Sequence, residues 1–308
     1  MKNLCKIGCF IFLLLCCNNM QAQDMERFSV ESTFYPSQAI EESDIEGEVG
    51  FWEWNGQLTL PQPIKGKKMI LIHRFSYSNL SVDLNATTNN VDTEFMKNYH
   101  TISYSLGLVK IFNPKWQLLV NVSPTLASDF GESLSGDDFI FQASSMAIYN
   151  KSKKFKYGFG LAYTTQFGIP IPIPLGMFKY TKPKMTLDIL LPNRISVMWN
   201  THKRINFGLA ATLNGGFFNN TGENPVVNSL IDEAGYSRLN LGPQVSFQLK
   251  EAIKLNLSGG MAAGRRLEFT DEFGDTIDRT PESGPFINLG VSFKPGGSKT
   301  EAVPRLGF

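Results

Sequence analysis

The chain has 308 residues, of which 42% are apolar and 19% are charged, and its formal net charge is +1. This balance excludes a disordered chain, a collagen-like fibre and a strongly basic nucleic-acid-binding protein. The information therefore lies in how the residues are ordered along the chain.

The first feature in chain order is a short apolar run over residues 7–17. It follows two lysines and precedes the small residue Ala22. A basic start, a short apolar centre and a small exit residue predict a secretory signal peptide over residues 1–23. The run is too short to cross a bilayer as a helix. We expect the mature part, residues 24–308, to form a single domain.

All four cysteines lie inside this predicted leader. The mature chain would have none, which excludes a disulfide-stabilised scaffold. No later segment reaches eighteen consecutive apolar residues, the length that indicates a transmembrane helix. If the chain spans a membrane, it must do so as a closed β-barrel, because lipid cannot satisfy open backbone groups.

Alternation of apolar and polar residues recurs along the mature chain. In residues 155–167 a large apolar side chain occupies every odd position except Thr165, and small or polar residues occupy the even positions. A period of two with one apolar and one polar face indicates a strand between lipid and water. The same pattern predicts strands over residues 25–35, 47–60, 69–83, 98–112, 116–127, 139–150, 155–168, 175–181, 185–192, 193–200, 205–219, 236–249, 253–270 and 284–294.

These spans predict an all-β protein, a transmembrane antiparallel up-and-down β-barrel of about fourteen strands. An even number is typical of single-chain bacterial barrels. Three short spans over residues 175–200 are interrupted by Pro183 and Pro192, so twelve and sixteen strands stay open as alternatives.

The connections alternate between short and long. Five long ones, over residues 36–46, 84–97, 128–138, 220–235 and 271–283, hold 18 of the 28 acidic residues. The short ones hold 13 basic residues and a single acid, Glu251. Short turns on one side and long loops on the other are typical of an outer-membrane barrel, with the short turns in the periplasm.

The three histidines, His73, His100 and His202, are the obvious candidates for catalysis. Barrel enzymes that hydrolyse lipids need a histidine and a serine on one strand face, two residues apart. The nearest serines, Ser76 and Ser103, are three residues away and therefore face the other side. Paired cysteine and histidine ligands for zinc are absent from the mature sequence. We expect no catalytic residue, no metal site and no cofactor.

Polar residues opposite the apolar stripes are candidates to line the barrel interior. Mixed charges could narrow a pore and select solutes, or they could pair with one another and fill the interior. Asp188 and Arg194 flank a very short connection and are placed to pair. The candidates are Lys156, Gln166, Asp188, Arg194, Arg238, Asn240 and Gln244.

Residues 169–174 read Ile-Pro-Ile-Pro-Ile-Pro. Alternate prolines fix φ and remove backbone donors, which favours an extended polyproline-II segment. We expect Pro170, Pro172 and Pro174 to form a stiff loop at the outer mouth. It would act either as a lid or constriction that touches an apolar ligand, or as a rim segment packed against other loops.

Residues 158–218 contain Ala162-Tyr-Thr-Thr-Gln-Phe167, Pro172-Ile-Pro174, Leu191-Pro192-Asn193-Arg194 and Phe207-Gly-Leu-Ala. The stretch resembles a family of uncharacterised outer-membrane β-barrel proteins of Gram-negative bacteria of the Bacteroidetes type. The resemblance implies the barrel fold. It implies no activity and no functional residue.

We therefore expect a non-enzymatic protein of a Gram-negative outer membrane, a channel or transporter for a small or apolar solute. The alternatives are a structural or assembly component of the envelope, a lipid-modifying barrel enzyme and a soluble secreted all-β binding protein. Expected partners are outer-membrane lipid, lipopolysaccharide and, during biogenesis, the barrel assembly machinery, with no nucleic acid. The oligomeric state stays open.

Overall fold

The computed structural model describes residues 26–41, 46–88, 91–201, 204–221, 223–224 and 229–294. The predicted signal peptide, His202 and the tail from residue 295 lie outside these residues. Within the described part of the chain, no helix is long and apolar enough to cross a membrane.

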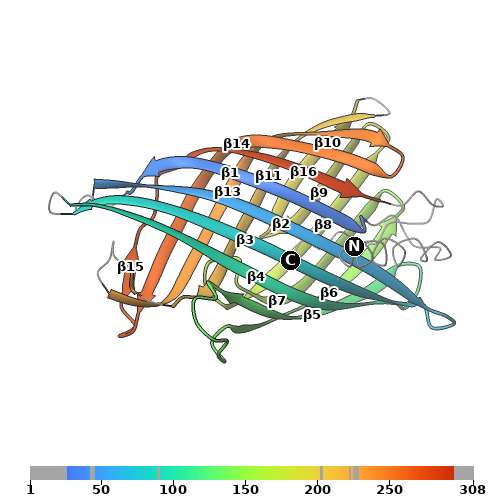
Figure 1. Cartoon of the computed structure of the whole chain (residues 1–308). Helices are drawn as coiled ribbons and strands as arrows, with labels where there is room; N and C mark the ends of the chain where they lie inside the picture. The colour runs from blue at the N-terminus through green and yellow to red at the C-terminus, as the bar shows by residue number, and fades with distance from the viewer. Residues whose placement is uncertain are drawn as a thin grey trace, which may run out of the picture.

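Fourteen antiparallel strands hydrogen-bond in one closed ring, as the alternation predicts (Figure 1). Each strand pairs with the next long strand of the chain, and the pairing of β16 with β1 closes the ring. The ring contains β1 (Phe28–Ala39), β2 (Glu46–Ile64), β3 (Met69–Thr88), β4 (Val91–Ile111), β5 (Trp116–Ser128), β6 (Phe139–Ser152), β7 (Phe155–Thr164), β8 (Ile171–Lys182), β9 (Met185–Leu191), β10 (Arg194–Asn200), β11 (Ile205–Asn219), β13 (Ser229–Lys250), β14 (Ile253–Asp271) and β16 (Gly284–Phe293). Two short strands, β12 (Glu223–Asn224) and β15 (Thr276–Asp278), extend the connections around β13 and β14.

Strand β7 shows how the two faces of the wall are used. Phe159 and Leu161 point outward and are each 65% exposed, whereas Ala162 points inward and is 4% exposed. Outward apolar side chains of this size recur on β1, β2, β6, β11, β14 and β16. Such a continuous apolar band is typical of a barrel surface in contact with lipid. We call the part of the barrel that carries it, next to the short lysine-rich turns, the belt half.

The strands differ greatly in length around the ring. Strand β4 has 21 residues and β13 has 22, whereas β9 and β10 have seven each. Figure 1 shows β2, β3 and β4 extending well beyond the ends of β5 and β7. The predicted loop over residues 84–97 is therefore wrong, because β3 and β4 continue to Thr88 and Val91. The last seven residues of the predicted loop over 220–235 likewise belong to β13.

Beyond the belt the polarity of the two faces reverses. In β2, Trp52 and Trp54 point outward and are exposed. Toward the N-terminal end of the same strand, Val49 is buried inside and Glu48 is exposed outside. Strand β14 repeats the change, with Leu267 buried inside and Arg266 exposed outside. Water outside the wall favours polar outward residues there, so the apolar residues turn inward. This reversal explains why the sequence pattern indicated loops in this region.

We call this second part of the barrel the loop half, and its buried cluster the loop core. Its walls meet across the interior. Tyr99 of β4 and Phe218 of β11 lie on opposite sides of the ring, yet their ring centroids are 5.0 Å apart. A bridge between Asn219 of β11 and Ser128 of β5 joins the same two sides. The loop core consists of Tyr35, Ile40, Val49, Phe51, Leu80, Val82, Leu84, Ala86, Phe95, Tyr99, Ala127, Phe218, Ile231, Ala234, Tyr236, Ala262, Leu267, Phe269 and Phe286.

Candidate functional site

The interior of the belt half is polar and partly solvated. Glu31 of β1 lies on the inward face, in line with buried Thr33 and Tyr35, and is nevertheless exposed. Solvent therefore reaches the interior at this level. On the other side of the ring, Asp188 lies 3.3 Å from Lys179 Nζ and 3.5 Å from Arg194 Nη2. The expected pairing of Asp188 with Arg194 is confirmed, and Lys179 adds a second cation.

A buried ion pair marks the boundary between the two halves. Arg238 of β13 is 3% exposed; it donates to the Glu53 carboxylate and, through Nε, to the Tyr35 hydroxyl. Asn240 Nδ2 donates to the same hydroxyl at 2.8 Å. Arg265 lies over the Phe51 ring, 4.8 Å from its centroid. These residues tie β1, β2, β13 and β14 together where the polar interior meets the loop core.

A second polar cluster closes the loop end. Lys97 of β4 forms an ion pair with Asp129, which follows β5. Thr221, just beyond β11, donates to Asp129 through its backbone amide at 3.1 Å and its hydroxyl at 3.0 Å. Asn219 Nδ2 donates to the Asp138 carboxylate at 2.8 Å. We call these five residues the end clamp, since they hold β4, β5 and β11 together across the ring.

The end clamp lowers the pKa of both of its carboxylates. Burial alone raises the pKa of Asp129, but the hydrogen bond from Lys97 and the backbone donors of Thr221 and Gly131 outweigh it and bring the pKa below its usual value. For Asp138, burial is likewise outweighed by the bond from Asn219, so its pKa is also lowered. Both groups are therefore held in the ionised form.

An apolar cluster interrupts the polar interior on the side of β6 to β9. We call it the inner apolar patch. Gly158 and Gly160 of β7 leave room for it, because a Cβ on Gly158 would come within 3.2 Å of Ile148 Cγ1. The patch consists of Met146, Ile148, Ala162, Ile173, Leu175, Met177 and Leu190, with Phe167 and Ile171 packed against it.

The predicted proline loop is shorter than expected. Ile171–Pro174 belong to β8, where Pro172 pairs with Tyr163 and Pro174 with Leu161. Both prolines point outward and are exposed. The prediction of a free polyproline segment is wrong for these residues, because β7 provides a strand partner on one side. Pro170 alone lies in a connection.

Gln166 also differs from its expected position. Strand β7 ends at Thr164 rather than at residue 168, so Gln166 lies in the connection to β8. Its side chain accepts a hydrogen bond from Asn193 Nδ2 in the turn between β9 and β10. The other predicted interior candidates follow the inward alternation of their strands: Lys156, Asp188, Arg194, Arg238, Asn240 and Gln244.

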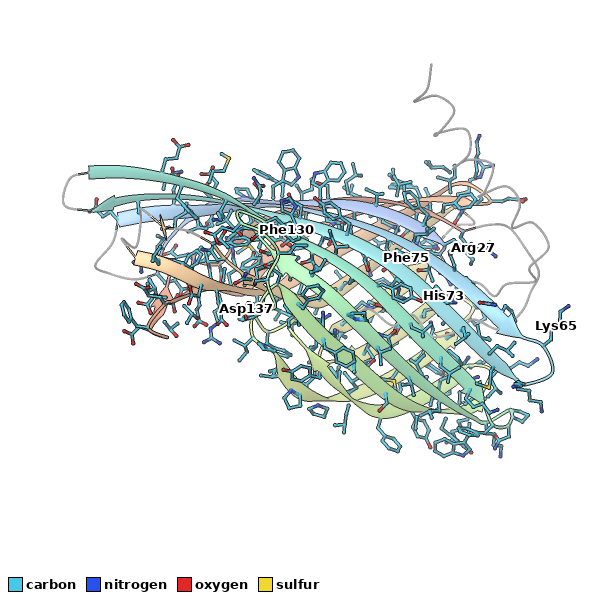
Figure 2. All side chains as sticks on the ribbon, turned by 60° about the horizontal axis from the view of Figure 1, so that its bottom comes forward. Arg27, Lys65, His73, Phe75, Phe130 and Asp137 are labelled. Atoms are coloured by element: carbon cyan, nitrogen blue, oxygen red, sulfur yellow. The ribbon has the colours of Figure 1, made fainter. Side chains whose placement is uncertain are left out.

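The histidines and serines considered for catalysis lie on opposite faces. His73 and His100 are on the outward face, where each contacts a tyrosine hydroxyl: Tyr104 at 2.8 Å and Tyr77 at 3.0 Å. Figure 2 shows His73 and Phe75 on the same face of β3. Ser76 and Ser103 face inward, with their hydroxyl oxygens 3.0 Å apart. The histidine–serine arrangement of a lipid hydrolase is not formed by these four residues.

Several residues of these clusters were not predicted. Glu53 could have been found, because it stands between the outward residues Trp52 and Trp54 and must face inward. Lys97 and Asp129 fell in segments that the pattern indicated to be loops, and nothing in the sequence brings them together. Phe167 was assigned to the apolar face of a longer strand.

Several barrels of known structure resemble this fold. The deltaS2 mutant of the TodX monoaromatic hydrocarbon channel is 9% identical, with a TM-score of 0.43, and the match covers 88% of this chain and 90% of that one. The translocator domain of the autotransporter NalP from Neisseria meningitidis is 9% identical, with a TM-score of 0.33 and 88% of each chain covered. LpxR from Salmonella typhimurium is 8% identical, with a TM-score of 0.33, over 86% of this chain and 99% of that one.

A search of curated proteins gave no match. The family model described as Domain of unknown function (DUF6268) matches residues 19–293, which is most of the sequence. The chain therefore belongs to the DUF6268 family.

Proposed function

We propose that this protein lies in the outer membrane of a Gram-negative bacterium and transports a small apolar solute. The location is supported by the outward apolar band of the belt half and by its even-stranded, closed ring. The single observation that favours an apolar solute is the inner apolar patch. It puts Leu175 and Met177 on an inward wall that elsewhere in the belt half carries charged and amide side chains.

We do not propose that the barrel is an open diffusion pore. The loop core fills one half of the barrel, and the contact between Tyr99 and Phe218 joins opposite walls. An ion entering the solvated belt half would meet a closed end. A transporter of this design carries little or no steady ionic current.

The test compares apolar entry with ion conductance. Cells that express the protein, and matched cells without it, are given N-phenylnaphthylamine, an apolar dye that fluoresces on entering lipid. We expect faster dye entry in the expressing cells and no steady conductance from the purified protein in planar bilayers. Equal dye entry in the two strains would contradict the proposed function, and a large steady conductance would favour a polar pore.

A structural role in the envelope is the second candidate, and the filled loop half favours it. A protein that only holds a partner needs no route through its wall. A stable partner that co-purifies, together with unchanged dye entry, would support this role instead. Against a lipid-modifying enzyme, His73 and His100 point outward, whereas the serines nearest to them in the sequence, Ser76 and Ser103, face inward.

A further inference from the structure

The barrel wall is incomplete above the short hairpin of β9 and β10. Strand β8 pairs with β9 only from Gly176 onward, and β10 pairs with β11 only as far as Thr212. Residues 171–175 of β8 and residues 213–219 of β11 therefore extend past the hairpin with no strand between them. At about 3.4 Å per residue, the edge of β8 alone runs about 17 Å beyond the hairpin.

The connection between β7 and β8 covers this gap from the outside. We call residues 165–170 the strap. A Cβ on Gly215 of β11 would collide with the Gln166 carbonyl oxygen, and one on Gly235 of β13 would collide with the Gly168 carbonyl oxygen. Both glycines lie on the outward alternation of their strands. They form a cradle in which the strap rests, and Gly168 itself adopts a φ of +80° there.

The strap separates the inner apolar patch from the outside of the wall. Phe167 reaches inward and packs against the patch. Ile169, two residues later, is 41% exposed. The strap therefore has an apolar side chain on the patch side, Phe167, and an exposed one, Ile169.

The alternate prolines fit this free edge. Proline cannot donate to a ladder and is confined to strand edges. Residues 172 and 174 send their backbone nitrogens the same way, and β8 has β7 on its other side. Because neither residue has an N–H, the edge that borders the gap offers no pair of donors to lipid or to a competing strand. The motif leaves a strand edge that needs no permanent partner.

Side-chain and turn contacts hold the strap. Gln166 accepts from Asn193 Nδ2, Gln166 N donates to Thr164 Oγ1 at 3.4 Å, and Gly168 N donates to Thr165 O at 3.0 Å. A segment that only completed the wall would gain from pairing with the free edges of β8 and β11. Among residues 165–175 and 213–219, all of which the structure describes, no backbone hydrogen bond joins the strap to either edge.

We propose that the strap closes a lateral port, through which an apolar solute passes between the inner apolar patch and the lipid beside the barrel. Displacement of Phe167 would join the two apolar surfaces without opening the loop end. This inference rests on the proposed function and specifies its route. The solute class is an uncharged apolar or aromatic molecule, since the path contains no charged partner.

The first experiment fixes the strap in place. Gln166→Cys and Asn193→Cys put thiols on two side chains that already touch. The natural cysteines lie in the predicted leader, so no other thiol is expected in the mature protein. We expect a short cleavable thiol cross-linker to abolish the protein-dependent dye entry and a reductant to restore it. The matched control, Ser76→Cys with Ser103→Cys, staples two neighbouring strands and should leave dye entry unchanged.

The second experiment displaces the strap. Gly235→Val fills the cradle and should raise dye entry, whereas Gly56→Val, at an outward glycine with only Tyr77 O at 3.9 Å, should not. Phe167→Ala removes the closing side chain without adding bulk, and it keeps the test valid if Gly235→Val does not fold. Phe159→Ala, on the lipid face, is its control.

A labelling experiment tests for the lateral port independently of solute transport. Ile173→Cys lies in the inner apolar patch and should react with a lipid-soluble maleimide only when Phe167→Ala is also present. Phe159→Cys should react in both backgrounds. Labelling at residue 173 without any dye entry would uphold the port and overturn the proposed function. Dye entry that survives the cross-link, or no labelling in the Phe167→Ala background, would overturn the lateral port.

Discussion

The two halves of this barrel place apolar residues on opposite faces of the same strands. In β2 the change occurs between Phe51, which is buried inside, and Trp52, which is exposed outside. The belt half needs apolar residues outward because lipid surrounds it, and its interior can stay wet. The loop half has water outside, so it is stable only if its interior is apolar and closed. One β-sheet thus works as a membrane wall at one end and as the shell of a packed core at the other.

The largest expected effect comes from the boundary between the halves. Glu53→Gln leaves the Arg238 guanidinium buried without its counter-charge, which typically costs about 3–5 kcal/mol. Glu268→Gln is the matched control, because Glu268 pairs with Arg266 on the exposed face of β14, where such pairs contribute about 0–1 kcal/mol. For both variants, the urea concentration at the midpoint of unfolding is measured by the heat-dependent shift in gel mobility. Equal losses in the two variants would mean that the boundary pair is as solvated as the exposed one.

The second-largest expected effect compares the outward faces of the two halves. Leu161→Arg puts a charge in the apolar belt, which costs about 2–4 kcal/mol at the middle of a bilayer. Glu48→Arg, on the outward face of the loop half, should change the free energy of unfolding by less than about 0.5 kcal/mol. Refolding into lipid vesicles followed by urea titration gives both values. A loop half that also lay in lipid would lose comparable stability in the second variant.

The belt half could be predicted from the sequence almost completely, and the loop half could not. In the belt, most outward residues are large and apolar, so the alternation of Phe159, Leu161 and their counterparts is visible without any knowledge of neighbours. In the loop half the inward residues, such as Val82 and Leu84, are apolar and their outward neighbours are polar. That pattern is indistinguishable from a loop until the opposite wall is known.

The polar side-chain clusters could not be predicted from the sequence for a related reason. Asp188 and Arg194 lie six residues apart and their pairing could be inferred from a short turn. Lys97 and Asp129 lie near the paired ends of the neighbouring strands β4 and β5, and closure of the ring brings Thr221 to them from the far side. The strap was missed because a strand edge without a partner has no sequence signal of its own. The alternate prolines predicted an extended segment, but not that β7 would pair with one side of it.

The smallest expected effect is on how the stability of the fold depends on pH. The end clamp lowers the pKa of Asp129 from its usual value of 3.8, so the folded state binds a proton less readily than the unfolded state. The stability that this carboxylate contributes is complete above the unfolded pKa and is lost as the pH falls through the lower folded pKa. The loop half should therefore weaken between about pH 5 and about pH 3, whereas the belt half, held by lipid contacts, should not.

Urea midpoints at the two pH values test this for the wild type, for Asp129→Asn and for Asp137→Asn. We expect Asp129→Asn to lower stability by about 1–3 kcal/mol at the higher pH, because it weakens charged hydrogen bonds. It should also reduce the loss on acidification. Asp137 is exposed at the same end of the barrel, as Figure 2 shows, and its variant should behave as the wild type does. If Asp129→Asn keeps the full acid sensitivity, the end clamp does not hold the opposite walls together, and the loop core alone closes the barrel.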